Sequence, residues 1–405
     1  MLYRAYQTYS DASEPLRAMA RAGVGLGKLF NNIDDLGFYK NLLALLELIA
    51  RSRLTHERPS YGIERIAIDG AEVGVREEIL LSLPFCDLVH FAKGDATAPQ
   101  PKMLIVAPLS GHFATLLRET VRTLLNDHEV YITDWKNARD VPLGEGGFGF
   151  EDYVDYVVKC LEKIGPGAHV LAVCQPCVQA LAAVAVMAEE RNPAEPRSMT
   201  LMAGPIDTRV NPSKVNALAS SKPIEWFEKN LISRVPFRLP GAGRRVYPGF
   251  VQLYAFMSMN MERHVKAHRD LYQHLANGRI EEAKAIATFY DEYFAVLDLP
   301  AEFYIETVKV VFQDALLAKG ELTYRGNKVD PRAIRRTALL TIEGERDDIC
   351  SIGQTAAAHL LCNGLRPHLK RHHFQAGVGH YGTFSGKRWN GEIYPVIRNL
   401  VLSMN

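Results

Sequence analysis

The sequence predicts an α/β protein in which a mostly parallel sheet is covered by helices on both faces and interrupted by a large helical insertion. Three observations support this fold class. Short apolar runs alternate with helical patterns between residues 103 and 207, as in a parallel sheet with both faces buried. The alternation stops after Asp207. Apolar runs of the same kind return at 338–342 and 369–374, with a helical pattern between them.

The chain starts with a segment that is predicted to be helical. Apolar residues in 1–55 recur at three- and four-residue steps, as at Leu42, Leu46 and Ile49, which is the spacing of one helix face. The pattern then changes to strands that Gly70 and Pro84 separate. These consecutive strands indicate an antiparallel start to the sheet, and they cover residues 63–69, 72–81 and 85–91.

The next segment alternates strands and helices. The predicted strands are 103–107, 130–134, 169–173 and 199–203, and the predicted helices are 112–125, 150–164 and 175–190. A βαβ unit takes roughly 30 residues, and the stretch 208–332 is far longer. We therefore predict a helical cap at 208–332 over the carboxyl edge of the sheet, where open α/β sheets bind ligands. The remaining predicted domains are a helical segment at 1–60 and a core at 61–207 and 333–405.

Composition and charge narrow the function classes. The 405 residues are 47% hydrophobic and carry a formal net charge of +1, which gives no electrostatic basis for binding nucleic acid or an acidic membrane surface. The six cysteines are scattered and do not resemble a disulfide framework. No secretory signal or apolar run of about 20 residues is evident. We expect a cytoplasmic protein without a transmembrane segment.

The strongest candidate nucleophile is Cys174. An apolar strand ends there, a helix follows at once, and Pro176 suits a first helical turn. A helix N-terminus and a nearby imidazolium lower the pKa of a thiol, so a cysteine at such a strand–turn–helix is suited to nucleophilic attack. The backbone N–H of Gln175 would be one oxyanion donor. Taken alone, a small apolar cysteine buried at a strand end explains this motif equally well.

Two further motifs lie at the ends of later strands. Asp347 and Asp348 follow a buried strand that ends in glycine, and both stay open as candidates for the acid of a triad. His380 lies between Gly379 and the nearby Gly382, which permit close backbone approach. The order Cys174, Asp347, His380 is the nucleophile–acid–histidine order of the α/β-hydrolase fold.

A weaker motif follows the first parallel strand. The loop at 107–112 is placed to supply the second oxyanion N–H, and Leu109 is favoured, with Ser110 close behind. A plain turn between a strand and a helix would explain the same residues.

The same segments resemble the intracellular poly(3-hydroxybutyrate) depolymerase family, which is also called the polyhydroxyalkanoate depolymerase family. The resemblance implies a Cys–Asp–His hydrolase at Cys174, Asp347 and His380 that acts on amorphous polyester granules inside bacteria. One departure is Cys177, where we would expect a residue such as threonine. The matching segments are 1–3, 107–112, 133–135, 173–176, 202–207, 298–304, 343–348 and 379–382.

The resemblance implies an uncharged polymer as the substrate, and the expected binding partners follow from that chemistry. An apolar groove suits a polyester polymer or oligomer better than ionic contacts, and exposed rings of the cap could contact a granule surface. We expect no cofactor and no metal site, because no ligand cluster or phosphate-binding glycine loop is evident. The oligomeric state is open, and a homodimer is one arrangement compatible with the sequence. The candidate substrate contacts are Ser110, Trp226, Phe250 and Tyr381.

Three alternatives remain at this point. A polyhydroxyalkanoate synthase-like acyltransferase would use the same fold and triad with 3-hydroxyacyl-coenzyme A. A thiol–disulfide oxidoreductase would use the C-x-x-C of Cys174 and Cys177, and a reversible disulfide there could also act as an off-switch. A non-catalytic granule-coat protein would need no reactive thiol.

Overall fold

The computed structural model describes residues 2–29, 37–68, 70–94, 99–259 and 261–405. Some predicted positions lie outside the described residues. They are Met1, at the start of the first family-like segment, and Asp69, at the end of the first predicted strand, together with residues 30–36 of the predicted helical segment, 95–98 of the predicted core and 260 of the predicted cap.

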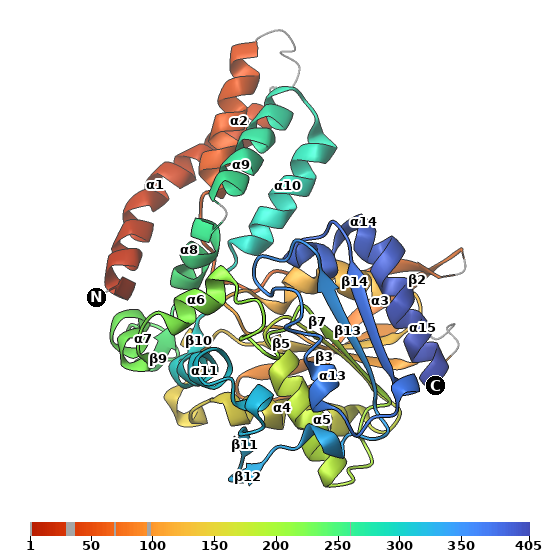
Figure 1. Cartoon of the computed structure of the whole chain (residues 1–405). Helices are drawn as coiled ribbons and strands as arrows, with labels where there is room; N and C mark the ends of the chain where they lie inside the picture. Colours follow the sequence, from red (N-terminus) through yellow and green to blue (C-terminus); the bar gives the residue numbers. More distant parts are fainter. Residues whose placement is uncertain (1, 30–36, 69, 95–98, 260) are drawn as a thin grey trace.

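A nine-stranded sheet forms the body of the molecule, with the order β1-β2-β3-β5-β4-β6-β7-β13-β14 (Figure 1). The pairs from β1 to β5 along this order are antiparallel, and all pairs from β5 to β14 are parallel. This is the predicted α/β-hydrolase fold. The strands are β1 (Arg65–Ile68), β2 (Ala71–Ser82), β3 (Cys86–Lys93), β4 (Lys102–Val106), β5 (Glu129–Trp135), β6 (His169–Val173), β7 (Ser198–Met202), β13 (Ala338–Gly344) and β14 (Lys370–Gln375).

Burial along the strands explains why the central ones are easy to recognise in the sequence. Every residue of β6, β7 and β13 is buried, and their sequences are mostly apolar, as expected when helices cover both faces. By contrast, β2 has many exposed residues. The strand predicted at 369–374 is present as β14, but the description of it as an apolar run was wrong: β14 has a mostly polar sequence, because it forms the far edge of the sheet.

Helices cover the two faces of the sheet. Helices α4 (Phe150–Ile164) and α5 (Cys177–Glu189) lie on one face, and α3 (Arg118–Leu124) and α15 (Tyr394–Met404) lie on the other (Figure 1). Three details differ from the predictions. The helix predicted from residue 112 starts as a 3₁₀ turn at Ala114. Only the short α13 (Ala358–Leu361) and turns connect β13 and β14, and α15 was not predicted.

The 208–332 stretch is mainly helical but also contains short strands that the sequence analysis missed. Strands β8 (Ser233–Arg234), β9 (Arg245–Tyr247) and β10 (Leu299–Pro300) form a small antiparallel sheet, and β11 (Thr323–Tyr324) and β12 (Asn327–Lys328) form a hairpin. The exact domain boundaries remain predictions. The helices are α6 (Lys214–Ser220), α7 (Ile224–Leu231), α8 (Gly249–Met259), α9 (Met261–Ala276), α10 (Ile280–Tyr293), α11 (Ala301–Thr307) and α12 (Leu316–Lys319).

The N-terminal helices α1 (Leu2–Leu29) and α2 (Gly37–Arg51) lie beside α9 and α10 and project away from the sheet (Figure 1). Helix α1 is tied to the insertion because the Tyr3 hydroxyl donates to Asp298 Oδ2 over 2.8 Å. Gly27 faces Leu43 so closely that a Cβ would lie 2.2 Å from it, so the glycine permits the close packing of α1 on α2. Within the described residues, no helix is long and apolar enough to cross a membrane.

Candidate active site

Cys174 stands at a sharp turn between β6 and α5. Its backbone has φ = 67°, which lies in the left-handed region that residues with a side chain rarely adopt. Its N–H still donates to the carbonyl of Met202 on the neighbouring strand, over 2.8 Å, so the turn is fixed to the sheet. The cysteine is partly exposed. A strained turn of this kind raises the side chain above the carboxyl edge of the sheet.

Gly204 allows a second loop to pack against this turn. A Cβ at Gly204 would lie 2.3 Å from Cys177 Sγ and 2.9 Å from the Cys174 carbonyl oxygen, distances that real atoms do not adopt. The chain after β7 therefore approaches the turn closely only because residue 204 has no side chain.

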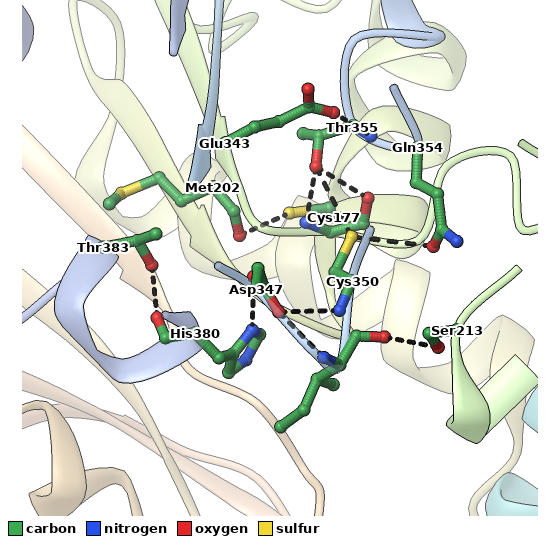
Figure 2. Close-up of polar contacts among 12 residues, drawn as sticks. Cys177, Met202, Ser213, Glu343, Asp347, Cys350, Gln354, Thr355, His380 and Thr383 are labelled. Carbon is green, nitrogen blue, oxygen red and sulfur yellow. Dashed lines mark hydrogen bonds and ion pairs between the residues drawn. The ribbon is translucent and has the colours of Figure 1, made fainter. Parts of the chain in front are cut away.

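Asp347 and His380 form a buried pair at the ends of β13 and β14. The imidazole Nδ1 lies 2.8 Å from Asp347 Oδ2 (Figure 2). The other carboxylate oxygen, Oδ1, accepts hydrogen bonds from the backbone N–H groups of Ile349 (2.9 Å) and Cys350 (2.8 Å). Asp348, by contrast, is exposed. Of the two acids left open by the sequence, Asp347 is the one that contacts the histidine.

His380 also lies close enough to Cys174 for that residue to raise the pKa of its imidazole. Because Nδ1 faces Asp347, Nε2 is the nitrogen available to the sulfur. Burial lowers the pKa of His380, but Asp347 and Cys174 both raise it, and the net pKa is well above the ordinary value. The structure therefore brings the three residues predicted at 174, 347 and 380 together, in surroundings that favour an imidazolium.

The second thiol of the C-x-x-C motif lies in a different environment. Cys177 is fully buried at the start of α5, and its Sγ lies 3.4 Å from the Ala172 carbonyl oxygen and 3.6 Å from that of Met202. Burial, together with Cys174, raises the pKa of the Cys177 thiol well above its ordinary value. Its side chain packs into the sheet, and the cysteines of the described chain are free thiols.

Two residues that the sequence analysis did not single out hold the loops of the site. The Glu343 carboxylate accepts hydrogen bonds from the backbone N–H groups of Gly353, Thr355 and Ala356. The Thr355 hydroxyl accepts from the Gly204 N–H and donates to the Gly204 carbonyl. Figure 2 shows both side chains beside Cys177 and Cys350. A buried acid at a strand end was a signal that sequence reasoning could have used for Glu343.

A cavity of about 170 Å³ borders the thiol, and we call it the Cys174 cavity. Leu109, Ser110 and Gln175 line it together with Cys174. The predicted oxyanion residues thus lie beside the predicted nucleophile, although their role as donors stays a prediction. The cap contributes apolar and aromatic side chains, among them Phe227, Tyr247, Phe303, Tyr304 and Phe312.

A second cavity, of about 330 Å³, borders the histidine, and we call it the His380 cavity. Tyr381 lines it with His380 and rings of α10. Phe256 and Ile349 line both cavities, so the two cavities are neighbours that share these two side chains. Trp226 and Phe250, which the sequence suggested as substrate contacts, are not among the residues that line either cavity. Phe250 stacks on Tyr6 of α1, with ring centroids 4.2 Å apart.

A comparison with protein families decides the assignment. The sequence model described as "PHB de-polymerase C-terminus" matches residues 203–405, which is half of the chain. The chain belongs to the PHB depolymerase family. It is therefore a carboxylic ester hydrolase. The matched half of the chain contains Asp347 and His380, whereas Cys174 lies before it.

The other comparisons found only distant similarity to known proteins. No curated protein matches the sequence. Among solved structures, 2-hydroxy-6-oxo-6-phenylhexa-2,4-dienoate hydrolase from Rhodococcus sp. has 12% identity and a TM-score of 0.42, with coverage of 81% of this chain and 99% of that chain. An enol-lactonase from Burkholderia xenovorans has 13% identity, a TM-score of 0.40 and coverage of 84% and 98%. An esterase from Thermogutta terrifontis has 12% identity, a TM-score of 0.41 and coverage of 83% and 98%.

Proposed function

We propose that this member of the PHB depolymerase family hydrolyses poly(3-hydroxybutyrate) or another short-chain polyhydroxyalkanoate through a Cys174–Asp347–His380 triad and an acyl-thioester intermediate. The observation that carries the proposal is the position of His380, which lies 2.8 Å from the Asp347 carboxylate and close enough to Cys174 for that residue to raise the pKa of its imidazole. A nucleophile, a base and an orienting acid in contact are what acyl transfer needs.

The mechanism has two halves. Cys174 Sγ, with its proton transferred to His380, attacks the ester carbonyl, and the oxyanion is held by the backbone N–H groups of Gln175 and the Leu109 region. The C–O bond of the ester breaks, and the alkoxide takes a proton from His380. Water then attacks the thioester while His380 accepts its proton, and the acid leaves as the thiol is restored. Asp347 keeps Nδ1–H of the imidazole oriented through both steps. The products are 3-hydroxybutyrate oligomers or monomer.

The lining of the Cys174 cavity supports an uncharged polyester as the substrate. Apolar and aromatic side chains dominate the Cys174 cavity, and such a surface favours aliphatic chain segments over charged groups. Exposed rings of the cap, such as Phe237 and Tyr254, support a contact with the surface of a polymer granule. We accordingly propose a cytoplasmic protein that associates with polyhydroxyalkanoate granules.

The environments of the cysteines favour hydrolysis over thiol–disulfide exchange. A C-x-x-C oxidoreductase needs a second thiol that can attack the mixed disulfide formed at the first, whereas the fully buried Cys177 directs its Sγ toward the carbonyl oxygens of Ala172 and Met202 in the sheet. A synthase-like transfer to a growing polymer would use the same triad. Incubation with 3-hydroxybutyryl-coenzyme A separates the two reactions, because a synthase releases free coenzyme A together with polymer and a hydrolase makes no polymer.

The direct test is Cys174→Ala, with Cys177→Ala as the matched control. The folded Cys174→Ala variant should lose about 10³-fold or more of its activity on amorphous poly(3-hydroxybutyrate), because the nucleophile is absent. Cys177→Ala should keep most of its activity, because its thiol takes no part in the reaction. Full activity in a folded Cys174→Ala variant would refute the proposed function.

A further inference from the structure

The Cys174 cavity contains polar groups that the fold does not satisfy. Both amide atoms of the Gln175 side chain and the Thr307 hydroxyl are buried without a hydrogen-bond partner in the described structure. Their residues are only 9% and 7% exposed, and both line this cavity. A buried polar group without a partner costs roughly 1–3 kcal/mol, so such groups beside a reactive thiol indicate a ligand that would satisfy them.

The size and lining of the cavity limit what that ligand is. Its volume of about 170 Å³ is close to that of an apolar cavity of about 150 Å³ that binds benzene. A 3-hydroxybutyryl group has the same number of non-hydrogen atoms as benzene. Its methyl and methylene groups match apolar walls such as Phe303 and Val308. Its one polar group besides the reacting carbonyl is the 3-oxygen.

The opposite side of the site offers more room. The His380 cavity, of about 330 Å³, is roughly twice as large. His380 is the group that gives a proton to the leaving oxygen, so the fragment that departs as an alcohol belongs on this side. The acyl fragment, which stays on Cys174, belongs in the smaller cavity. A polyester chain is therefore accommodated unequally, with a short acyl part and a longer alcohol part.

We propose that the Cys174 cavity binds one 3-hydroxyacyl unit at the hydroxyl end of the polymer, with Gln175 and Thr307 hydrogen-bonded to its free 3-hydroxyl. The enzyme would then release one monomer in each cycle. This inference deepens the proposed function and rests on it. In an ester chain, only the terminal unit has a 3-hydroxyl that can both donate and accept a hydrogen bond. The Gln175 amide offers an acceptor and a donor, and the Thr307 hydroxyl offers both as well.

The bond changes are consistent with repeated removal of the terminal unit. Attack of Cys174 Sγ on the first ester carbonyl breaks the C–O bond to the rest of the chain. The departing oxygen takes a proton from His380, so the shortened chain ends in a new 3-hydroxyl. Water then supplies hydroxide to the thioester carbonyl and a proton to the sulfur, and the terminal unit leaves as a free 3-hydroxy acid. The remaining chain has the same kind of end as before.

The test uses three forms of the linear trimer of (R)-3-hydroxybutyrate. The first has both ends free, the second has its hydroxyl end converted to a methyl ether, and the third has its carboxyl end converted to a methyl ester. The free trimer should give monomer and dimer as first products. The methyl ether should react at least about tenfold more slowly, because its 3-oxygen no longer donates a hydrogen bond and the added methyl group makes the end of the chain too large for the cavity. The carboxyl methyl ester should match the free trimer.

Substitutions of Thr307 and Gln175 test the proposed hydrogen bonds to the 3-hydroxyl directly. Thr307→Val and Gln175→Met keep approximate side-chain size but lose the hydrogen bonds. Each should lower kcat/KM for the free trimer about tenfold, towards the value for the methyl ether. Thr200→Val and Gln179→Met are matched controls, because these side chains are also buried and without partners but do not line the Cys174 cavity. Both controls should keep the wild-type preference for the free hydroxyl end.

The outcomes separate this inference from the proposed function. One outcome is that Cys174→Ala hydrolyses none of the trimers, while the wild-type enzyme hydrolyses the methyl ether as fast as the free trimer. In that case the proposed recognition of the hydroxyl end is wrong, and the proposed triad stands. If no trimer or polymer is hydrolysed by the wild-type protein, the proposed function fails first. The inference would also be overturned if Thr307→Val and Gln175→Met both kept the full wild-type preference for the free trimer over the methyl ether.

Discussion

The core and the cap contribute different things to the site. The core places Cys174, Asp347 and His380 at the ends of β6, β13 and β14, where fixed hydrogen bonds hold each group. The cap contributes mostly apolar and aromatic side chains to the cavity walls. We therefore propose that the residues of the sheet carry out the chemistry and that the cap selects the substrate. Core substitutions should therefore change kcat, and cap substitutions should change KM and specificity.

The largest expected effect is a difference in kcat between substitutions of the two neighbouring acids, Asp347 and Asp348. Asp347→Asn should lower kcat by roughly 10²–10⁴-fold, because it removes the carboxylate that orients and charges His380. Asp348→Asn, one residue later, should change kcat only a few-fold, because Asp348 is exposed and Asp347 supplies the contact with His380. Steady-state kinetics on a soluble 3-hydroxybutyrate oligomer measure both. Equal losses in the two variants would contradict the assignment of the acid.

A smaller effect is expected for the cap. Phe256 is a half-buried ring that lines both cavities. Phe256→Ala should raise KM about tenfold, from the lost apolar contact area, and leave kcat within a few-fold. Phe237→Ala provides the control, because this cap ring is 91% exposed and lines neither cavity. A fall in kcat with an unchanged KM in the Phe256 variant would break the division between core and cap.

The smallest effect concerns stability. Burial lowers the pKa of His380, yet Asp347 and Cys174 raise it well above the ordinary value, so the folded protein keeps a proton that the unfolded chain loses above about pH 6.5. This stabilisation is fully present below that pH and is lost as pH rises through the folded pKa. Asp347→Asn should therefore destabilise the protein more at about pH 6 than at about pH 10, by on the order of 1 kcal/mol.

Urea unfolding of the wild type and of Asp347→Asn at both pH values measures this difference. His380→Gln should show a similar loss of pH dependence, since it removes the titrating group itself. A stability gap between wild type and Asp347→Asn that grows with pH would mean that the folded pKa of His380 is lowered.

The parallel half of the fold was predictable because burial on both faces leaves a plain signal. Strands such as β6 and β7 are fully buried and mostly apolar, and the helices around them follow a helical period. The short strands of the cap, such as β8 and β10, have only two residues each, which is too few for a period to be seen. Their pairing depends on contacts between distant segments, and those are not visible in local sequence.

The site shows the same limit. Strand ends indicated Cys174 and His380, but they could not separate Asp347 from Asp348, because that choice depends on which carboxylate meets the imidazole. Thr307 was not predicted to belong to the site, since it lies at the end of α11 and reaches the Cys174 cavity only through the fold of the cap.

Trapping the acyl-enzyme tests the central claim most directly. The protein would be mixed with an activated 3-hydroxybutyryl ester, quenched in acid and digested, and the modified residue would be identified by mass spectrometry. We expect a single thioester on Cys174 that disappears in the Cys174→Ala variant. A label on Ser110 or Cys177, or a hydrolytically active enzyme that never carries an acyl group, would contradict the account.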